Sequence, residues 1–416
     1  MKDKQSLVEL PYFRDSSTIF KYNTIYNILT TKKNITLITL FQNTHIKKYK
    51  KTSFSTANPF SLLKDNLGDK QSSHTSLPFT GGALGYFAYD LGRRIENLPK
   101  LSQHDLNIPD MAIGFYDWAV IVDHHLRQSW LVSHDSQQIT KQQWSELTKL
   151  FQKPAQKEYQ PFKSVSNYIS NFDELSYVNA FKKIKQYIIE GDCYQFNLAQ
   201  RFSVNVSGDP LSAYLLLREL NPAPFACYMN LKDCAILSSS PERFLKVKSN
   251  LVETKPIKGT RRRSVFAYED TALAQELLES EKDRAENVMI VDLLRNDLGK
   301  NCIAGSISVP KLYALESYAT VHHLVSTIVG RLSDSTHVVD LLRGCFPGGS
   351  ITGAPKLRSM EIIEELEPNR RNVYCGSIGY IGYNGNMDSN IAIRTLVHHK
   401  NNQYYSENYH TDNYIF

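Results

Sequence analysis

The spacing of apolar residues changes along this chain of 416 residues, and the change limits the folds that it can adopt. Before the polar, proline-containing segment 152–170, apolar residues come in short runs such as Ile35–Phe41 and Trp118–Val122, which are typical of β-strands. After it, long helical patterns alternate with strand patterns. A mixture of this kind, without a strict β-α-β repeat, predicts an α+β fold in which helices cover sheets.

Segment 152–170 is also the expected boundary between two regions, because it combines Pro154 and Pro161 with many polar residues. We expect an N-terminal region over residues 1–152 and a C-terminal region over residues 165–416. A second polar segment, Thr52–Ser76, is expected to be a loop.

Three helices and a strand are expected in the C-terminal region. Asp173 can cap a helix that runs to Gly191, with apolar residues at helical spacing. A second helix is predicted over Thr271–Leu298, and a third begins near Pro355 and stops before the next proline. Between the first two, Tyr194–Phe202 alternates apolar and polar residues as a strand does.

Composition argues against two classes of partner. The net charge of +6 comes from 48 basic and 42 acidic residues spread along the chain, without a basic stripe interleaved with aromatics, so nucleic acid is not expected. No apolar run reaches the length of a membrane span, so no membrane contact is expected. Six scattered cysteines without a CxxC pair predict the reduced thiols of a cytoplasmic protein.

The stretch Ser238–Leu245, SSSPERFL, places Glu242 directly after a proline. Such a carboxylate could serve as a general acid or base if burial raised its pKa. It could equally be a turn carboxylate paired with Arg243. The spacing alone favours the pairing.

The stretch Thr254–Arg263, TKPIKGTRRR, is strongly basic. It could be a solvated loop, and its composition alone favours that interpretation. However, Lys258 lies between Ile257 and Gly259, a context that can bury the amine. Burial and neighbouring cations would both lower the pKa of the amine, as a nucleophile at neutral pH requires.

Asp283 and Glu286 are three residues apart in the predicted second helix, so both carboxylates share one face. Nearby lysines and arginines could neutralise them. Alternatively the pair could bind Mg²⁺, which takes one or two carboxylates and several waters. The residues leave these alternatives open.

Two further stretches carry polar groups suited to an anion. Ser350 and Thr352 place hydroxyls in a glycine turn, closed by Gly353, before the third helix, where a carboxylate, a phosphate or no ligand at all would fit. Arg394 lies within the apolar run Ile391–Val397, expected to be a strand, and a buried arginine there would require a carboxylate partner.

In the same order and spacing, these stretches resemble the motifs of the chorismate-utilising enzymes, and most closely those of the aminodeoxychorismate synthase component I group. The C-terminal motifs are GDCYQFNLAQRF, SSSPERFL, TKPIKGTRRR, SEKDRAENVMIVDLLRNDLG, GGSITGAPK and CGSIGYIGYNGNMD. The N-terminal third contributes ELPYF at Glu9–Phe13, GGALGYFAYDLGRRIE at Gly81–Glu96 and GFYDWAVIVDH at Gly114–His124. The resemblance therefore covers nearly the whole chain.

The resemblance implies a large two-layered α/β sandwich with its active site in the C-terminal region. Lys258 occurs where the related anthranilate synthase component I has alanine, and Gln195 occurs where isochorismate-forming relatives have lysine. This combination favours aminodeoxychorismate synthesis. Anthranilate synthase component I, in tryptophan synthesis, is the alternative.

The resemblance also implies the roles of individual residues. Lys258 would be the nucleophile toward chorismate, Glu242 the acid that protonates the leaving hydroxyl, and Glu286 the Mg²⁺ ligand, with Asp283 acting through water. The substrate contacts implied are Gly259, Thr260, His323, Ser350, Thr352, Gly353, Tyr380 and Arg394.

The implied product is 4-amino-4-deoxychorismate, for p-aminobenzoate and folate synthesis. A separate glutamine amidotransferase subunit would supply the ammonia, giving a heterodimer. Glu9–Phe13 matches the position at which relatives bind tryptophan, so tryptophan is a further possible ligand.

The sequence departs from the family pattern after Ala392–Thr395. Relatives continue with a GGGIVAD stretch and a helix carrying an ExxE pair and a lysine, whereas residues 401–416 read NNQYYSENYHTDNYIF. We expect a catalytic region incomplete at its C-terminal end, weaker Mg²⁺ binding and an exposed sheet edge. A catalytically impaired remnant that still binds its partner or tryptophan is therefore a further hypothesis.

Overall fold

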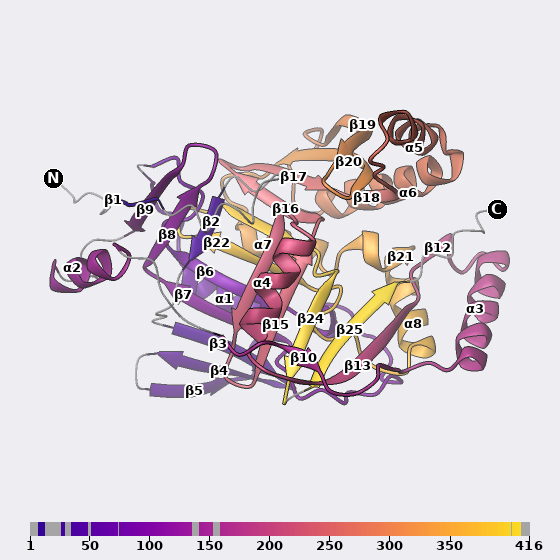
Figure 1. Cartoon of the computed structure of the whole chain (residues 1–416), viewed down its shortest axis with the longest axis horizontal. Coiled ribbons are helices and arrows are strands. Elements are labelled where there is room, and N and C mark those ends of the chain that lie inside the picture. Colours follow the sequence, from indigo (N-terminus) through magenta and orange to yellow (C-terminus); the bar gives the residue numbers. More distant parts are fainter. Residues whose placement is uncertain are drawn as a thin grey trace.

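The structure is a computed structural model that describes residues 7–12, 26–29, 35–48, 51–73, 75–134, 141–152, 159–400 and 402–408. It contains one large sheet, three smaller sheets and helices that cover them (Figure 1). This architecture confirms the predicted α+β sandwich. None of the helices in the described ranges is both long and apolar enough to cross a membrane.

The largest sheet has 12 strands, and both halves of the chain contribute to it. In spatial order its strands are β18 (Ile257–Arg262), β20 (Val321–Arg331), β17 (Leu251–Lys255), β16 (Arg243–Lys248), β23 (Met387–Asn390), β22 (Ser377–Gly382), β6 (Gly82–Phe87), β7 (Met111–Tyr116), β3 (Ile35–Leu40), β4 (Asn43–Lys48) and β5 (Lys51–Ser55), with β19 (Ser308–Ser317) paired to β20. The halves meet where β22 pairs antiparallel with β6, from Ser377 opposite Phe87 to Gly382 opposite Gly82. The sheet therefore continues across the predicted boundary at 152–170, whose role as a domain boundary stays a prediction.

The other strands form three smaller sheets. The seven-stranded sheet contains β10 (Lys163–Ser164), β13 (Ala199–Ser207), β25 (Asn402–Asn408), β24 (Thr395–His399), β15 (Cys234–Ser240) and β14 (Phe225–Asn230), with β11 (Ile169–Ser170) paired to β13. The four-stranded sheet contains β1 (Leu7–Leu10), β9 (Gln128–Ser133), β8 (Trp118–Asp123) and β2 (Tyr26–Leu29). A short pair joins β12 (Gln195–Phe196) to β21 (Gly353–Ala354).

The helices are α1 (Pro59–Leu67), α2 (Lys141–Leu150), α3 (Glu174–Ile189), α4 (Pro210–Leu220), α5 (Ala267–Glu279), α6 (Glu281–Gly299), α7 (Val338–Cys345) and α8 (Lys356–Leu366), with 3-10 turns η2 (Tyr89–Arg94) and η3 (Gly349–Ile351). Helices α5 and α6 lie beside β18, β19 and β20 at one end of the large sheet (Figure 1). This end carries half of the candidate site residues, among them Lys258 and Glu286.

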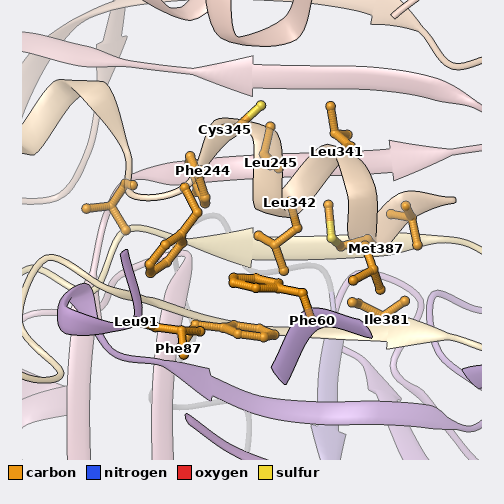
Figure 2. Packing of buried hydrophobic residues seen from close by; sticks show 14 of the residues in the cluster. Phe60, Phe87, Leu91, Phe244, Leu245, Leu341, Leu342, Cys345, Ile381 and Met387 are labelled. Atoms are coloured by element: carbon orange, nitrogen blue, oxygen red, sulfur yellow. The ribbon is translucent and has the colours of Figure 1, made fainter. Parts of the chain in front are cut away.

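One large apolar cluster packs the helices onto the large sheet. Phe60 of α1 and Leu342 of α7 meet Phe87, Phe244 and the neighbouring strands (Figure 2). Four buried residues on one face of α6 belong to the same cluster: Ile290, Val291, Leu294 and Leu298. Because burying each such side chain contributes about 1.5–3 kcal/mol, the core fixes α6 firmly against the sheet.

The loop predicted for Thr52–Ser76 is wrong up to Leu67, because this part of the segment contains most of β5 and the whole of α1. Phe60, Leu63 and Leu67 are spaced for one helical face and are all buried. Asn58 caps the helix by accepting a hydrogen bond from the Phe60 amide. The polar residues that suggested a loop are those on the outer face.

The single helix predicted over Thr271–Leu298 is interrupted. Ser280 adopts an extended conformation (φ −63°, ψ 106°), and its hydroxyl accepts a hydrogen bond from the Asp283 amide, 3.2 Å away. A new helix therefore begins at Glu281. The break places Asp283 and Glu286 in the first two turns of α6.

Other predictions are confirmed more directly. Asp173 caps α3 in a capping box with Ser176, and α8 begins directly after Pro355. The predicted strand Tyr194–Phe202 is divided, however, because β12 pairs with β21 whereas β13 joins the seven-stranded sheet.

The C-terminal segment is also part of a sheet. Residues Asn402–Asn408 form β25, which pairs antiparallel with β13 on one side and β24 on the other. The prediction of an exposed sheet edge at the C-terminal segment is therefore wrong. Of the motif Glu9–Phe13, residues up to Tyr12 are described, and Phe13 lies outside the described residues.

Candidate functional site

Lys258 is buried in β18, with only 3% of its surface exposed. Burial lowers the pKa of its amine, although the carboxylates of Glu286 and Glu242 oppose that shift. The solvated interpretation of this lysine is therefore wrong. A buried amine between two carboxylates is suited to act as a nucleophile.

Gly259 allows β18 to pass close to α6. Its φ is +80°, and a Cβ at this position would lie 2.8 Å from Leu277 Cδ1 and 2.9 Å from the Asp283 Cβ and Cγ. A larger residue would therefore be strained by its backbone conformation and by its neighbours. The glycine brings the backbone next to Lys258 against the first turn of α6.

Glu242 is buried in the short connection between β15 and β16, with 4% of its surface exposed. Burial raises the pKa of its carboxyl to about 7, opposed by hydrogen bonds from Ser350 and the Ile257 amide and by the charge of Lys258. The predicted pairing with Arg243 is wrong, because Arg243 binds Glu253 at 2.8 Å and Asp388 at 3.1 Å instead. A carboxyl with a pKa near neutrality is suited to general acid chemistry.

The hydroxyls of Ser350 and Thr352 lie in the same glycine turn but bind different groups. The Ser350 hydroxyl reaches Glu242, whereas the Thr352 hydroxyl bonds the turn carbonyls of Gly348 at 3.3 Å and Gly349 at 3.1 Å. Gly353 lies in β21, where a Cβ would be 2.3 Å from the carbonyl oxygen of Gln195. Of the three predicted substrate contacts in the turn, Ser350 is therefore the one in direct contact with the buried acid.

His323, Thr260 and Arg394 form a wall beside β18. Thr260 Oγ1 lies 2.8 Å from His323 Nδ1. Burial first, and the charge of Arg394 second, lower the pKa of His323 to about 4, so its imidazole is neutral at pH 7. Arg394 is half-buried at a turn before β24, with φ +49°, so the predicted strand interior at this residue is wrong. The arginine nevertheless lies close enough to His323 for its charge to lower the pKa of the imidazole.

The carboxylates Asp283 and Glu286 extend from the start of α6 toward β18. Asp283 accepts a hydrogen bond from Arg261 at 3.1 Å, and Glu286 acts electrostatically on Lys258. Within the described ranges, no group of three or more histidine, cysteine, aspartate or glutamate side chains is arranged to hold a metal ion. Two carboxylates do fit a cation such as Mg²⁺, which keeps waters and takes other oxygens from a bound substrate.

Tyr380 packs in an apolar cluster. It lies in β22, and its ring is 5.3 Å from Phe79, in the apolar cluster that also contains Ala119 and Ile121 of β8. Its predicted contact with substrate stays a prediction.

Cys375 and Asn197 lie at the site but were not found from the sequence. Gln195 was used only to separate related families and was given no structural role. Cys375 lies close to Lys258 and Glu242, and burial raises the pKa of its thiol to about 12, so the thiol beside them is neutral. Asn197 donates to the Ser350 carbonyl at 3.3 Å. The buried Gln195 Oε1 has no hydrogen-bond partner among the described residues. Nothing in the local sequence marks Cys375 or Asn197, because their neighbours come from distant segments.

Comparisons with known proteins identify the family of this chain. A family model described as chorismate binding enzyme matches residues 21–407. Aminodeoxychorismate synthase component 1 of Escherichia coli (strain K12) is 46% identical over 375 residues, covering 89% of this chain and 81% of the relative. The protein of the same name from Klebsiella aerogenes is also 46% identical, covering 89% of this chain and 82% of the relative.

The solved structures agree as well. The crystal structure of anthranilate synthase component I from Streptococcus pneumoniae TIGR4 superposes with a TM-score of 0.82 at 29% identity, covering 92% of this chain and 87% of that chain. The match of the family model to most of the chain, together with the identity to these relatives, establishes its membership: the chain belongs to the chorismate binding enzymes.

Proposed function

We propose that this chain is the large subunit of an aminodeoxychorismate synthase, which converts chorismate and ammonia to 4-amino-4-deoxychorismate and water. The observation that carries the proposal is the buried amine of Lys258, which faces Glu242 and Glu286. The 46% identity to relatives with this name supports it.

The residues of the chain suggest the order of bond changes. In its unprotonated form, which burial favours, the Lys258 amine forms a bond to ring carbon 2 of chorismate as the hydroxyl on carbon 4 leaves. Glu242 is suited to donate the proton that makes this leaving group water, because burial raises the pKa of its carboxyl to about 7. Ammonia then adds at carbon 4 and passes one of its protons back to Glu242. The bond between Lys258 and carbon 2 breaks with its electron pair on the lysine nitrogen, so that both side chains are regenerated.

The wall formed by Thr260, His323 and Arg394 is suited to hold a carboxylate of the substrate. Arg394 supplies positive charge, and the neutral imidazole of His323 is oriented by the Thr260 hydroxyl. Gly259 lets the substrate approach the β18 backbone beside Lys258. Ser350 holds Glu242 at the opposite turn.

Glu286 and Asp283 would hold Mg²⁺ in this proposal. The ion would neutralise a substrate carboxylate when bound. Arg261, which donates a hydrogen bond to Asp283, would balance the charge of the Asp283 carboxylate.

The component 1 names of the relatives imply a second component, and we propose that it is a glutamine amidotransferase that supplies the ammonia. A tryptophan site at Glu9–Phe13 remains a prediction. A thermal-shift titration with tryptophan would test it, and an unchanged melting temperature would contradict it.

The direct test of the function is product analysis. Purified protein is incubated with chorismate, Mg²⁺ and an ammonium salt, and the products are separated and identified by mass spectrometry. We expect 4-amino-4-deoxychorismate. Anthranilate would support the anthranilate synthase alternative, and the absence of either product would support a non-catalytic remnant.

A further inference from the structure

Arg371 and Glu367 form a buried ion pair beside the glycine turn, and neither belongs to the site residues described above. Their side chains are 2% and 3% exposed. Hydrogen bonds join Arg371 Nε to Glu367 Oε2 at 2.9 Å and Arg371 Nη2 to Glu367 Oε1 at 2.6 Å. Burial opposes the charge of Arg371, but Glu367 keeps the pKa of the guanidinium well above its usual range. The guanidinium therefore carries its charge at every pH of an assay.

Stability alone does not account for a buried ion pair. The cost of taking two charges out of water roughly offsets their attraction, so apolar side chains of similar size often stabilise an interior equally well. Apolar side chains cannot, however, supply directed hydrogen bonds to the backbone. The groups that this pair binds therefore indicate its role.

Two donors of Arg371 converge on the part of the glycine turn that carries Ser350. Arg371 Nη1 donates to the carbonyl of Ile351, the residue after Ser350, at 2.8 Å. Arg371 Nη2 donates to the Asn197 carbonyl at 2.7 Å, and the Asn197 side chain in turn donates to the Ser350 carbonyl at 3.3 Å. Because a guanidinium is planar and rigid, it fixes the two carbonyls relative to each other. One side chain thus holds Ser350 from two sides.

Glu367 and Tyr89 fix the position of the guanidinium itself. Glu367 Oε1 also accepts a hydrogen bond from the amide of Ala199, at the start of β13, at 2.9 Å. The guanidinium carbon of Arg371 lies 4.9 Å from the centre of the Tyr89 ring of η2, a favourable arrangement for a cation. Segments from both halves of the chain therefore hold Arg371 in one orientation.

The position of the turn affects Glu242 through a hydroxyl. The Ser350 hydroxyl donates a hydrogen bond to the Glu242 carboxyl, and this bond lowers a pKa that burial raises to about 7. A shift of the backbone at Ile351 or Asn197 would move the hydroxyl away from the carboxyl. A displacement of about 1 Å can lower the rate of a reaction about 10²-fold, even when the substituted residue is far from the reacting atoms.

We propose that Arg371 and Glu367 are positioning residues, which hold Ser350 and through it place Glu242 for proton transfer to the leaving hydroxyl. The inference rests on the proposed function, because Glu242 has this task only if a hydroxyl of chorismate leaves. Neither residue touches the substrate. Their loss should therefore lower kcat more than it changes the KM for chorismate.

A double-mutant cycle of Arg371→Lys and Ser350→Ala tests the proposal. Lysine keeps the charge beside Glu367 but lacks the planar fork that binds two carbonyls. Each single variant should lower kcat about tenfold or more and change the KM for chorismate by less than about threefold. The double variant should lie within about threefold of the slower single variant, because both substitutions remove the same contact. The falling limb of kcat should also move to higher pH in Arg371→Lys, since Glu242 loses a hydrogen bond that lowers its pKa.

Arg358→Lys is the matched control. Arg358 lies on α8, binds Glu361 at 3.1 Å and is 5.3 Å from the centre of the Tyr187 ring, so it too combines a carboxylate with a tyrosine. This substitution should change kcat by less than about threefold. Circular dichroism verifies folding. If Arg371→Lys does not fold, Glu367→Gln takes its place in the cycle, because it weakens the hold on the guanidinium with a side chain of the same shape.

The outcomes distinguish the two proposals. If the unmodified protein forms no aminodeoxychorismate from chorismate and ammonium salt, the proposed function fails and the positioning role fails with it. If it forms product and the losses of the single variants multiply in the double variant, the positioning role alone is overturned. A folded Arg371→Lys variant with the kcat of the unmodified protein would also overturn it, because the pair would then only stabilise the fold.

Discussion

Lys258 and the arginines that follow it on β18 belong to one basic stretch, but they lie in opposite environments. Lys258 is buried beside Glu242 and Glu286, whereas the other cations pair with acidic residues nearer the surface. These pairs are Lys255 with Glu316, Arg261 with Glu276 and Asp283, Arg262 with Glu269, and Arg263 with Asp270. The other cations therefore attach β17, β18 and the residue after β18 to neighbouring segments, whereas Lys258 lies in the interior.

This difference shows why charge density alone was misleading. In an alternating strand, neighbouring residues point to opposite faces, so one basic run can supply both a buried amine and a set of surface ion pairs. Gly259 marks the position where the backbone turns away from regular geometry and contacts α6.

The sharpest test of the comparison replaces the two lysines of the stretch separately. Lys258→Met should lower kcat/KM at least about 10³-fold, because the nucleophile is lost. Lys255→Met removes a half-buried ion pair with Glu316 and should change kcat/KM by less than about threefold. Steady-state kinetics with chorismate and ammonia, with circular dichroism to verify folding, measure both. Equal losses in the two variants would contradict a special role for the buried lysine.

The next largest effect is expected at the acid. Glu242→Gln should lower kcat about 10²–10⁴-fold, because the amide cannot donate the carboxyl proton. In the unmodified protein kcat should fall as the pH rises through about 7, the pKa of Glu242, and this limb should vanish in the variant. A pH profile of both proteins measures it, and an unchanged falling limb in the variant would assign the proton to another group.

The same substitution should change the dependence of stability on pH. The folded carboxyl has a pKa of about 7 against a reference of 4.5, so the folded state retains a proton that the unfolded state releases between these values. The free energy of unfolding should therefore fall as the pH rises through that window, by up to about 3 kcal/mol from this group. Urea titrations from pH 4.5 to 8 should show a flatter profile for Glu242→Gln.

A smaller effect tests the contact between β18 and α6. Gly259→Ala should lower the free energy of unfolding by about 2–4 kcal/mol, because it adds a clash with Asp283 to the cost of a positive φ. Gly305→Ala is the matched control, since Gly305 has φ +78° and no atom within 4 Å of a Cβ. It should cost only about 1–2 kcal/mol. If the two variants lose equal free energy of unfolding in urea denaturation, a close contact between β18 and α6 at Gly259 is contradicted.

The smallest effect is expected at the exposed end of the basic stretch. The Arg262 side chain is 74% exposed and pairs with Glu269. Arg262→Met should change the free energy of unfolding by less than about 0.5 kcal/mol and leave kcat/KM unchanged. A loss of activity comparable to that of Lys258→Met would contradict the division of the stretch into two environments.

Much of the fold could be predicted because periodicity reports on secondary structure directly. The capped helix after Asp173 and the helix after Pro355 were found in this way. The break at Ser280 was not, because the residues on its two sides continue a helical pattern and only one side-chain cap interrupts it. The helix α1 was hidden by its polar outer face.

The site was predicted less completely. Composition around Lys258 and Glu242 favoured solvated or paired side chains, since burial depends on segments far away in the sequence. The resemblance to a family implied roles for both residues, and the structure shows that both are buried. Arg394 was placed in a strand because its neighbours are apolar, but it has a positive φ at a turn.

The pairing of β6 with β22 has a consequence for building hybrids of related enzymes. The strand Gly82–Phe87 of the amino-terminal third and the strand Ser377–Gly382 of the carboxy-terminal region share one ladder of backbone hydrogen bonds. A hybrid that takes its first third from one relative must reproduce this register, because a slip of one residue turns every side chain of the strand to the other face. The exchange of the amino-terminal third therefore depends on the pairing of β6 with β22 in the middle of the sheet. This pairing lies far along the chain from the point at which the two sequences would be joined.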